Sequence, residues 1–386
     1  MKILIVLTYY RPHISGLTIY VERLARALAK RGHHVTVLTS HYQKDLPYRE
    51  IIDGVTVIRH PVLFRFSKGS IMPGFLSRAW ALMSQHDIVH IHLPQAEGGL
   101  LALIGRWLAR KPVVLTYHSD LQMPKGLINR VIDRFVFASN MIAGFFANSI
   151  SAYTDDFARH SPFLSKFGDK IVVIAPPIEI CAPDPVAVNT LKERYHADGQ
   201  LVVGFAARFA EEKGIQYLIN SIPFVREKIP NVKYLLAGEY QNVIGEHVWQ
   251  DLQPLIQQYR EYLEFLGPVP VHEMGNFFGA CDVLTVASIN STETFGLVQV
   301  EAMMSGCPAV ATNLPGVREP IRITGMGEIV PIKDARALAD GIVRVLQNRA
   351  QYVRPRHEIE ALFAIEQTVQ AYEKLYAKLQ ARPKST

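Results

Sequence analysis

The sequence has little cysteine: only three cysteines occur among its 386 residues. Cys181, Cys281 and Cys307 are too few and too scattered for a disulfide framework or for a cysteine-based metal site. Chains with so few cysteines are typical of a reducing compartment. We therefore expect a cytoplasmic protein.

Long hydrophobic runs are also lacking. No stretch reaches the roughly 18 uninterrupted apolar residues that span a bilayer, and the nearest approach, 96–109, is interrupted by Glu97 and Arg106. The apolar run Ile3–Leu7 is too short for the hydrophobic region of a signal peptide. We expect a soluble protein, or at most one that is peripheral to a membrane.

Three common ligand-binding patterns are absent as well. Neither Gly-x-Gly-x-x-Gly nor Gly-x-x-x-x-Gly-Lys-(Ser/Thr) occurs, which disfavours a nicotinamide dehydrogenase and a P-loop NTPase. No Asp-x-Asp pattern and no cluster of metal ligands is evident where a strand is expected to end. The sequence therefore predicts no metal site.

Short apolar runs alternate along the chain with amphipathic stretches of helical length. Ile3–Leu7 is followed by 17–30, which has apolar residues at helical spacing, and then by Val35–Leu38. Apolar strands separated by helices are typical of a parallel sheet covered on both faces. The other runs that predict strands are 55–58, 88–91, 113–115, 142–146, 171–174, 201–206, 232–237, 263–266, 283–286 and 309–311.

The segment 175–185 interrupts this alternation with four prolines in eleven residues. Proline continues neither a helix nor a central strand, so the segment predicts a linker. We expect two Rossmann-like α/β domains with doubly wound parallel sheets, 1–176 and 177–364. A C-terminal helix and tail, 365–386, would pack back toward the first domain. Ligands of such sheets bind beyond the carboxyl ends of the strands, which predicts a site in an interdomain cleft.

Two clusters in the first half follow predicted strands. Ser15 and Gly16 precede a helix whose free N–H groups would attract phosphate, although a plain turn glycine explains them equally well. His118 stands at a strand exit within the segment 116–120. A lone histidine at such a place is more often structural than functional.

Two further clusters lie in the second half. Arg208 and Lys213 flank a tight loop and would together neutralise a diphosphate, although ordinary surface charge is the alternative. Glu293 precedes an apolar helix that begins at Gly296, and Glu301 lies inside it. A buried carboxylate needs a partner, such as a ribose diol or a salt-bridged neighbour.

In their order and spacing these pieces resemble the retaining glycosyltransferase family 4, which has the GT-B fold. The likeness rests on the opening run that ends at 30–35, on the Arg208–Lys213 pair and on the Glu-x7-Glu pattern of Glu293 and Glu301. It extends over nearly the whole chain. One departure is Ser15-Gly16, where the family often has Gly-Gly.

The resemblance implies roles for the second half of the chain. Arg208 and Lys213 would bind the donor diphosphate and stabilise the leaving group, and Glu293 would hold hydroxyls of the donor sugar. Glu301 would bind the ribose, and the backbone of Val269 would contact the base. The backbone N–H groups that would bind the same phosphates are those of Phe295, Gly296 and Leu297.

The resemblance also implies roles for the first half. His118 would lie beside the donor sugar near the anomeric centre and, with Arg208, Lys213 and Glu293, would form the catalytic set. Gly16 would lie near the phosphate and the acceptor. Ser15 and Asp120 are candidates for the acceptor side.

The implied activity is metal-independent transfer of a hexosyl unit, with retention, from a UDP- or GDP-sugar substrate to an acceptor hydroxyl, without a cofactor. We expect same-face attack in which the leaving phosphate takes the acceptor's proton, because Asp120 alone accompanies His118. A covalent nucleophile stays open. Another GT-B nucleotide-sugar enzyme, such as an epimerase, and a catalytically silent nucleotide-sugar binding module are the alternatives.

The charge of the chain is unevenly distributed. Residues 1–175 contain 21 Lys and Arg against 11 Asp and Glu, whereas the remainder contains 20 against 24. The segments 64–80 and 123–137 mix cations with large apolar residues, as membrane-surface helices do. We expect a glycan or lipid acceptor, with an anionic membrane rather than nucleic acid as the partner. Ordinary core helices with a solvated basic face are the alternative.

Overall fold

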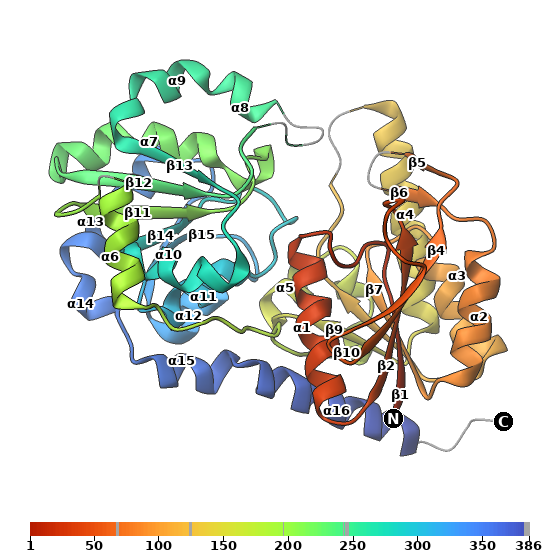
Figure 1. Cartoon of the computed structure of the whole chain (residues 1–386). Coiled ribbons are helices and arrows are strands. Elements are labelled where there is room, and N and C mark those ends of the chain that lie inside the picture. The colour runs from red at the N-terminus through yellow and green to blue at the C-terminus, as the bar shows by residue number, and fades with distance from the viewer. Residues whose placement is uncertain (67–68, 123–125, 196, 242, 244–246, 382–386) are drawn as a thin grey trace. The chain divides into compact units, whose positions relative to one another are not determined.

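The computed structural model describes the chain except for residues 67–68, 123–125, 196, 242, 244–246 and 382–386. The chain divides into two compact units (Figure 1). The first comprises Met1–Pro177 together with the C-terminal segment from Ile365, and the second comprises Ile178–Ala364. Of the predicted linker 175–185, residues 175–184 form neither helix nor strand beyond one parallel bridge between Ile178 and Ala364, and Pro185 begins a helix.

The first unit contains an eight-stranded sheet of order β10-β9-β8-β7-β1-β2-β4-β3. Its neighbouring strands are parallel except β3 and β4. The strands are β1 (Lys2–Val6), β2 (His34–His41), β3 (Arg49–Ile52), β4 (Val55–Pro61), β7 (Ile88–Leu93), β8 (Val113–Tyr117), β9 (Ser149–Ala152) and β10 (Ile171–Val173). A separate antiparallel hairpin joins β5 (Phe64–Phe66) and β6 (Gly69–Ile71).

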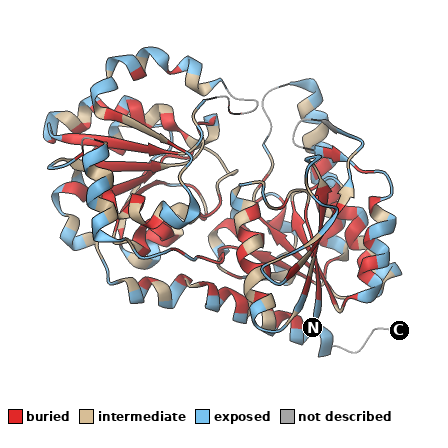
Figure 2. Ribbon diagram, in the orientation of Figure 1, coloured by how far each residue is buried: buried red, intermediate tan, exposed pale blue. Residues whose placement is uncertain are grey.

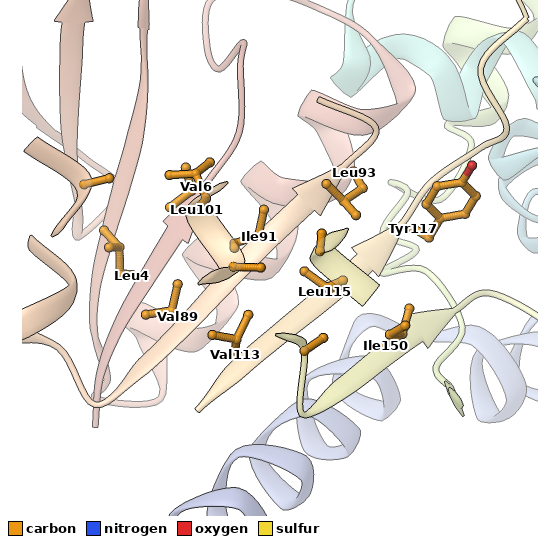
Figure 3. Close-up of a cluster of buried hydrophobic side chains, with 14 of the residues drawn as sticks. Leu4, Val6, Val89, Ile91, Leu93, Leu101, Val113, Leu115, Tyr117 and Ile150 are labelled. Carbon is orange, nitrogen blue, oxygen red and sulfur yellow. The ribbon is translucent and has the colours of Figure 1, made fainter. Parts of the chain in front are cut away.

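One face of this sheet forms an apolar core. Val89 and Ile91 of β7 and Leu115 of β8 lie there near Leu101 of α3 (Figure 3). Side chains from α2, α4 and α5 belong to the same core. The helices of the first unit are α1 (Gly16–Lys30), α2 (Phe75–Gln85), α3 (Gly98–Leu103), α4 (Leu127–Phe146), α5 (Asp155–His160) and α16 (Ile365–Ala381).

The prediction of a strand at 142–146 is wrong, because these residues form the last turns of α4. A short apolar run cannot be assigned to helix or strand by periodicity alone. Here the preceding turn is anchored to α3, since Ser139 Oγ accepts a hydrogen bond from the backbone N–H of Gly99 at 2.9 Å. The strand lies three residues further on, as β9.

The opposite face of the same sheet carries polar side chains. Successive residues of a strand point to opposite faces, so His90 and His92 of β7 share this face. Thr116 of β8 pairs in register with His92, and Ser151 of β9 pairs with Thr116. All four side chains are buried.

Tyr372 of α16 connects this polar face to the helices. Its hydroxyl donates to Ser151 Oγ at 2.9 Å and lies 2.7 Å from both Thr116 Oγ1 and the hydroxyl of Tyr20 on α1. The ends of the first unit's chain therefore meet in one hydrogen-bond network.

The second unit contains a six-stranded sheet of order β13-β12-β11-β14-β15-β16, with all neighbours parallel. Its strands are β11 (Leu201–Ala206), β12 (Val232–Ala237), β13 (Leu263–Gly267), β14 (Val283–Val286), β15 (Ala309–Thr312) and β16 (Gly327–Val330). Its helices are α6 (Pro185–Arg194), α7 (Ile215–Lys228), α8 (Val248–Asp251), α9 (Gln253–Gln258), α10 (Met274–Ala280), α11 (Leu297–Met304), α12 (Glu319–Thr324), α13 (Ala335–Gln347), α14 (Arg349–Tyr352) and α15 (Arg356–Phe363).

The second sheet also carries an apolar core, in which side chains of α7 and α13 pack on β11, β12, β14 and β15. Figure 2 shows the strands of this sheet coloured mostly as buried. The strands that the sequence did not predict are short, and β3 and β16 lie at sheet edges. β16 contains Gly327 and Glu328, so half of its residues give no apolar signal.

Removing one hydroxyl tests the polar network. Tyr372→Phe should lower the free energy of unfolding by about 1–3 kcal/mol, because it leaves buried partners without a hydrogen bond. Tyr48→Phe is the matched control, since Tyr48 is 59% exposed and its hydroxyl makes no hydrogen bond within the described residues. Urea unfolding of both variants measures the difference, and equal stability would contradict the network.

Candidate functional site

Two loops meet at the carboxyl end of the second sheet because β11 and β14 are direct neighbours. The loop 207–214 follows β11, and the loop 287–296 follows β14. The backbone N–H of Ile289 donates to the carbonyl of Glu212 at 3.0 Å. Gly214 has φ of +66°, and a Cβ there would lie only 2.0 Å from the carbonyl oxygen of Ala287. Only glycine permits so close an approach of two backbones.

An ion pair joins the same two loops. Lys213 Nζ lies 2.6 Å from Glu293 Oε2, and the other oxygen, Oε1, accepts the backbone N–H of Gly296 at 3.0 Å. Gly296 adopts a left-handed conformation, with φ of +71°, and precedes the first residue of α11. The positive end of a helix dipole favours a negative charge at this place. The Glu293 carboxylate thus accepts a hydrogen bond from the N–H of Gly296, one of the groups predicted to bind a phosphate.

Arg208 is paired as well. Its Nη2 donates to Glu212 Oε1 at 2.7 Å, and 39% of the arginine side chain remains exposed. Each of the two predicted cations is therefore matched by one carboxylate. The four side chains together carry no net charge.

The remaining residues predicted in this unit surround these loops. Phe295 is buried, and its carbonyl accepts a hydrogen bond from Gln299 at 2.5 Å. Leu297, the first residue of α11, is half-buried, and Glu301 inside that helix is only 7% exposed. Val269 is half-buried on the loop after β13. Val269 thus follows a different strand from the other site residues, at the same end of the sheet.

In the first unit, Ser15 caps α1. Its Oγ accepts the backbone N–H of Thr18 at 3.2 Å, and Thr18 Oγ1 accepts the N–H of Ser15 at 2.7 Å. This reciprocal capping box stabilises a helix start. Gly16, the first residue of α1, is exposed. The cap explains why serine stands before Gly16.

His118 follows β8 and is 7% exposed. Its Nε2 lies 2.8 Å from Nδ1 of His92, and its Nδ1 is hydrogen-bonded to the hydroxyl of Tyr153. Burial lowers the pKa of His118 from 6.5 to about 3, so the imidazole is neutral near pH 7. Both ring nitrogens therefore have partners inside the protein.

Asp120 is also buried, and its partners explain its position. Its Oδ1 accepts the hydroxyl of Tyr117 at 3.1 Å and the hydroxyl of Ser161 at 2.7 Å. Proximity to this carboxylate adds to burial in raising the pKa of Tyr117. These bonds tie the loop after β8 to the segment that follows α5.

Sequence reasoning missed His92 and Tyr153. His90 and His92 alternate within an otherwise apolar strand, which places both on one face of the sheet. That alternation is a signal that a histidine layer lies beside His118. Tyr153, directly after β9, carries no comparable signal.

Among the described residues, no helix is long and apolar enough to cross a membrane. No group of three or more His, Cys, Asp or Glu in the described part of the chain has the arrangement of metal ligands.

Family models match both units. The model "Glycosyltransferase Family 4" matches residues 14–180, and the model "Glycosyl transferases group 1" matches residues 200–348. The chain belongs to glycosyltransferase family 4. The family predicted from the motifs is confirmed, and the protein is a transferase enzyme.

Two mycobacterial mannosyltransferases are similar to this glycosyltransferase. The phosphatidyl-myo-inositol mannosyltransferase of Mycobacterium tuberculosis is 26% identical over 358 residues, covering 88% of this chain and 86% of the relative. A GDP-mannose-dependent alpha-(1-6)-phosphatidylinositol monomannoside mannosyltransferase of Mycolicibacterium smegmatis is 25% identical over 356 residues, covering 88% and 87%.

Solved structures confirm the predicted GT-B fold of the glycosyltransferase. HepE of Anabaena, in complex with UDP and glucose, has a TM-score of 0.77 at 19% identity and covers 98% of this chain and 100% of its own. Sucrose-phosphate synthase of Thermosynechococcus elongatus has a TM-score of 0.76 at 22% identity, covering 98% and 99%. At these identities the likeness shows the fold alone.

A glycine comparison tests the contact that positions Lys213. Gly214→Ala should lower the free energy of unfolding by about 3 kcal/mol or more, because the new Cβ collides with a backbone carbonyl at a positive φ. Gly199→Ala is the control, since Gly199 has φ of +67° but nothing within 4 Å of its Cβ position. It should cost only about 1 kcal/mol. Urea unfolding separates the two, and equal losses would show that the contact is unimportant.

Proposed function

We propose that this glycosyltransferase moves a hexosyl unit from a nucleoside-diphosphate sugar to an acceptor hydroxyl, with retention and without a metal or cofactor. The observation that carries the proposal is the ion pair of Lys213 and Glu293 at the start of α11. A cation, an anion and a helix N-terminus meet there, at the carboxyl end of a parallel sheet. Such a place suits the diphosphate of a donor.

Departure of a nucleoside diphosphate creates negative charge that must be stabilised. Arg208 and Lys213 would supply fixed positive charge, and the N–H groups at the start of α11 would add hydrogen bonds. The carboxylates of Glu212 and Glu293 now neutralise these cations. We propose that the donor diphosphate replaces Glu293 as the partner of Lys213, which releases the Glu293 carboxylate to hydroxyls of the donor sugar.

The first unit would contribute His118 beside the donor sugar. Because His118 is neutral and both its nitrogens are engaged, it is poorly suited to take a proton from the acceptor. This supports same-face attack: the bond from the acceptor oxygen to the anomeric carbon forms as the bond to the phosphate oxygen breaks. The acceptor's proton then passes to that phosphate oxygen.

The donor would be a GDP- or UDP-sugar, with Glu301 on the ribose and the backbone of Val269 on the base. One relative is named as GDP-mannose-dependent, and one structural neighbour contains UDP and glucose. Measuring thermal shifts with a panel of nucleotide-sugars, GDP-mannose and UDP-glucose included, would identify the donor. A donor that binds should raise the melting temperature, because it binds only the folded state.

Removing the lysine charge tests the proposed leaving-group role. Lys213→Ala should lower kcat for the selected donor at least about 100-fold, because one group that balances the developing charge is lost. Lys228→Ala, at an exposed lysine of the same unit, should leave kcat unchanged. Both variants are compared by nucleoside-diphosphate release.

Two results would contradict this mechanism. A near-normal kcat for Lys213→Ala would reject the role of the ammonium group. Strict dependence of the wild type on an added divalent metal, tested with and without a chelator, would reject transfer that relies on protein charge alone.

We further propose a lipid or lipid-linked acceptor at the cytoplasmic face of an anionic membrane. The support is one face of α4, along which a row of apolar side chains is exposed. At 3.6 residues per turn these side chains fall within an arc of roughly 100°. This apolar stripe consists of Leu127, Ile128, Val131, Phe135, Ala138, Ile142 and Phe145.

Cations and a tryptophan border the apolar stripe. Arg130 and Arg134 are exposed on α4 itself, and Trp107, 69% exposed, contacts the end of α4 through Phe146. A hollow of about 510 Å³ beside them is lined by Arg106 among others. Exposed apolar area rimmed by positive charge suits an anionic lipid surface.

Parts of both segments that suggested a membrane surface lie outside the described residues, namely 67–68 and 123–125. The names of the mycobacterial relatives contain phosphatidylinositol, which supports a lipid acceptor.

Vesicle binding tests the stripe. Vesicles with equal parts of phosphatidylglycerol and phosphatidylcholine should co-sediment the wild type at low salt, and vesicles of phosphatidylcholine alone should not. The double variant Phe135→Ser, Phe145→Ser should bind at least about tenfold more weakly, because two exposed rings that would become buried in the membrane are lost. Phe137→Ser is the control on the same helix, outside the stripe. No binding by the wild type, with dimers in sedimentation velocity, would show instead that the stripe joins two copies.

A further inference from the structure

Three buried histidines lie in a row in the first unit, and the proposed reaction uses only one of them. The ring centroids of His90 and His92 are 4.3 Å apart, and those of His92 and His118 are 5.1 Å apart. Their exposed fractions are 0%, 1% and 7%. In such a place a ring nitrogen can find hydrogen-bond partners only among protein groups.

The hydrogen-bond network assigns the proton of His90. Tyr372 donates its only hydroxyl proton to Ser151, so it accepts from Thr116, whose hydroxyl proton is thereby used. Thr116 Oγ1 must then accept from His90 Nε2, which lies 2.7 Å away. The hydroxyl of Tyr376 donates to His90 Nδ1 at 2.8 Å.

His90 is therefore satisfied without His92, which it touches only through the rings. The one hydrogen-bond partner of His92 in the described residues is His118, through Nδ1. The other nitrogen of His92, Nε2, is buried and has no partner there. This asymmetry decides which of the two rings carries the shared proton.

Two arrangements of that proton are conceivable. If His118 donated, neutral His92 would carry its own proton on Nε2 and bury an N–H donor without an acceptor. If His92 donates from Nδ1, only a lone pair is left without a partner. Buried N–H groups without acceptors are the rarer and costlier fault. The second arrangement is therefore favoured.

Donation by His92 fixes the state of His118. The Nε2 of His118 then accepts, so neutral His118 carries its proton on Nδ1 and donates it to the oxygen of Tyr153. The ring of Tyr20 packs edge-on against His118, with centroids 4.9 Å apart. These two hydrogen bonds, together with ring contacts to Tyr20, His92 and Tyr153, thus hold the orientation of the ring.

We infer that His92 is a positioning residue for the transfer reaction: its Nδ1–H bond holds His118 as the Nδ1–H tautomer in one orientation. The inference rests on the proposed role of His118 beside the donor sugar. Burial also lowers the pKa of His92 well below 6.5, so both rings stay neutral near pH 7. Neutral His118 can carry its proton on either ring nitrogen, and the hydrogen bond from His92 determines which one.

Nuclear magnetic resonance of the full chain labelled with ¹⁵N-histidine reads the tautomer directly. In the wild type, His118 should carry its proton on Nδ1, and its signals are assigned by their loss in His118→Gln. In His92→Asn the amide nitrogen stands near the former Nδ1 and donates in its place, so the Nδ1–H tautomer should persist. In His92→Leu, which has similar volume but no donor, the Nε2–H tautomer should appear.

Kinetics of the same variants report the consequence for the reaction. Hydrolysis of GDP-mannose or UDP-glucose without acceptor, whichever donor the thermal-shift panel selects, should show kcat about 10- to 100-fold lower in His92→Leu. The KM for the donor should stay within about twofold, and His92→Asn should recover most of kcat. A role in packing alone would give similar losses in both variants.

Three results would overturn the inference: an Nε2–H tautomer of His118 in the wild type, an unchanged tautomer in His92→Leu, or an unchanged kcat in that variant. If His92→Leu does not fold, the wild-type spectrum and His92→Asn still decide the tautomer. A wild type that neither binds nor hydrolyses any nucleotide-sugar would reject the proposed function, while the spectra would still test His92 as the donor to His118.

Discussion

The pairing of Lys213 with Glu293 is the interaction on which the candidate site depends. The two residues are 80 positions apart, and they meet because β11 and β14 are neighbours in a parallel sheet. Gly214 allows the loop of the lysine to approach the backbone of the other loop. One short carboxylate then joins an ammonium group to a helix N-terminus. The Glu293 carboxylate thereby supplies the negative charge that a bound diphosphate would otherwise supply to Lys213 and to the start of α11.

Much of the architecture could be predicted because local sequence patterns indicate it. Most strands of both sheets were located from apolar runs, and the Glu-x7-Glu spacing marked both carboxylates before any fold was known. The error at 142–146 has a physical cause: the run is apolar whether it forms a buried strand or the end of α4. Contacts with distant segments, such as that of Ser139 with α3, distinguish the two.

What could not be predicted depends on contacts between distant segments. No local signal shows that Lys213 is neutralised by Glu293, or that both nitrogens of His118 are already bonded. These residues become neighbours through the order of the strands in each sheet, and that order cannot be deduced from the sequence. The histidine pair in β7 gave a hint of a polar sheet face, but its partners on α16 lie almost 300 residues away.

The place of α16 has a consequence for how the protein is made. The first unit needs Tyr372 to complete the buried network on its sheet, yet that helix leaves the ribosome only after the entire second unit. All residues of the second unit are therefore synthesised before the first unit is complete. Until α16 is added, the polar face of the first sheet stays uncovered. The hydrogen bonds that Tyr372 and Tyr376 make to this face can therefore form only after α16 has been translated.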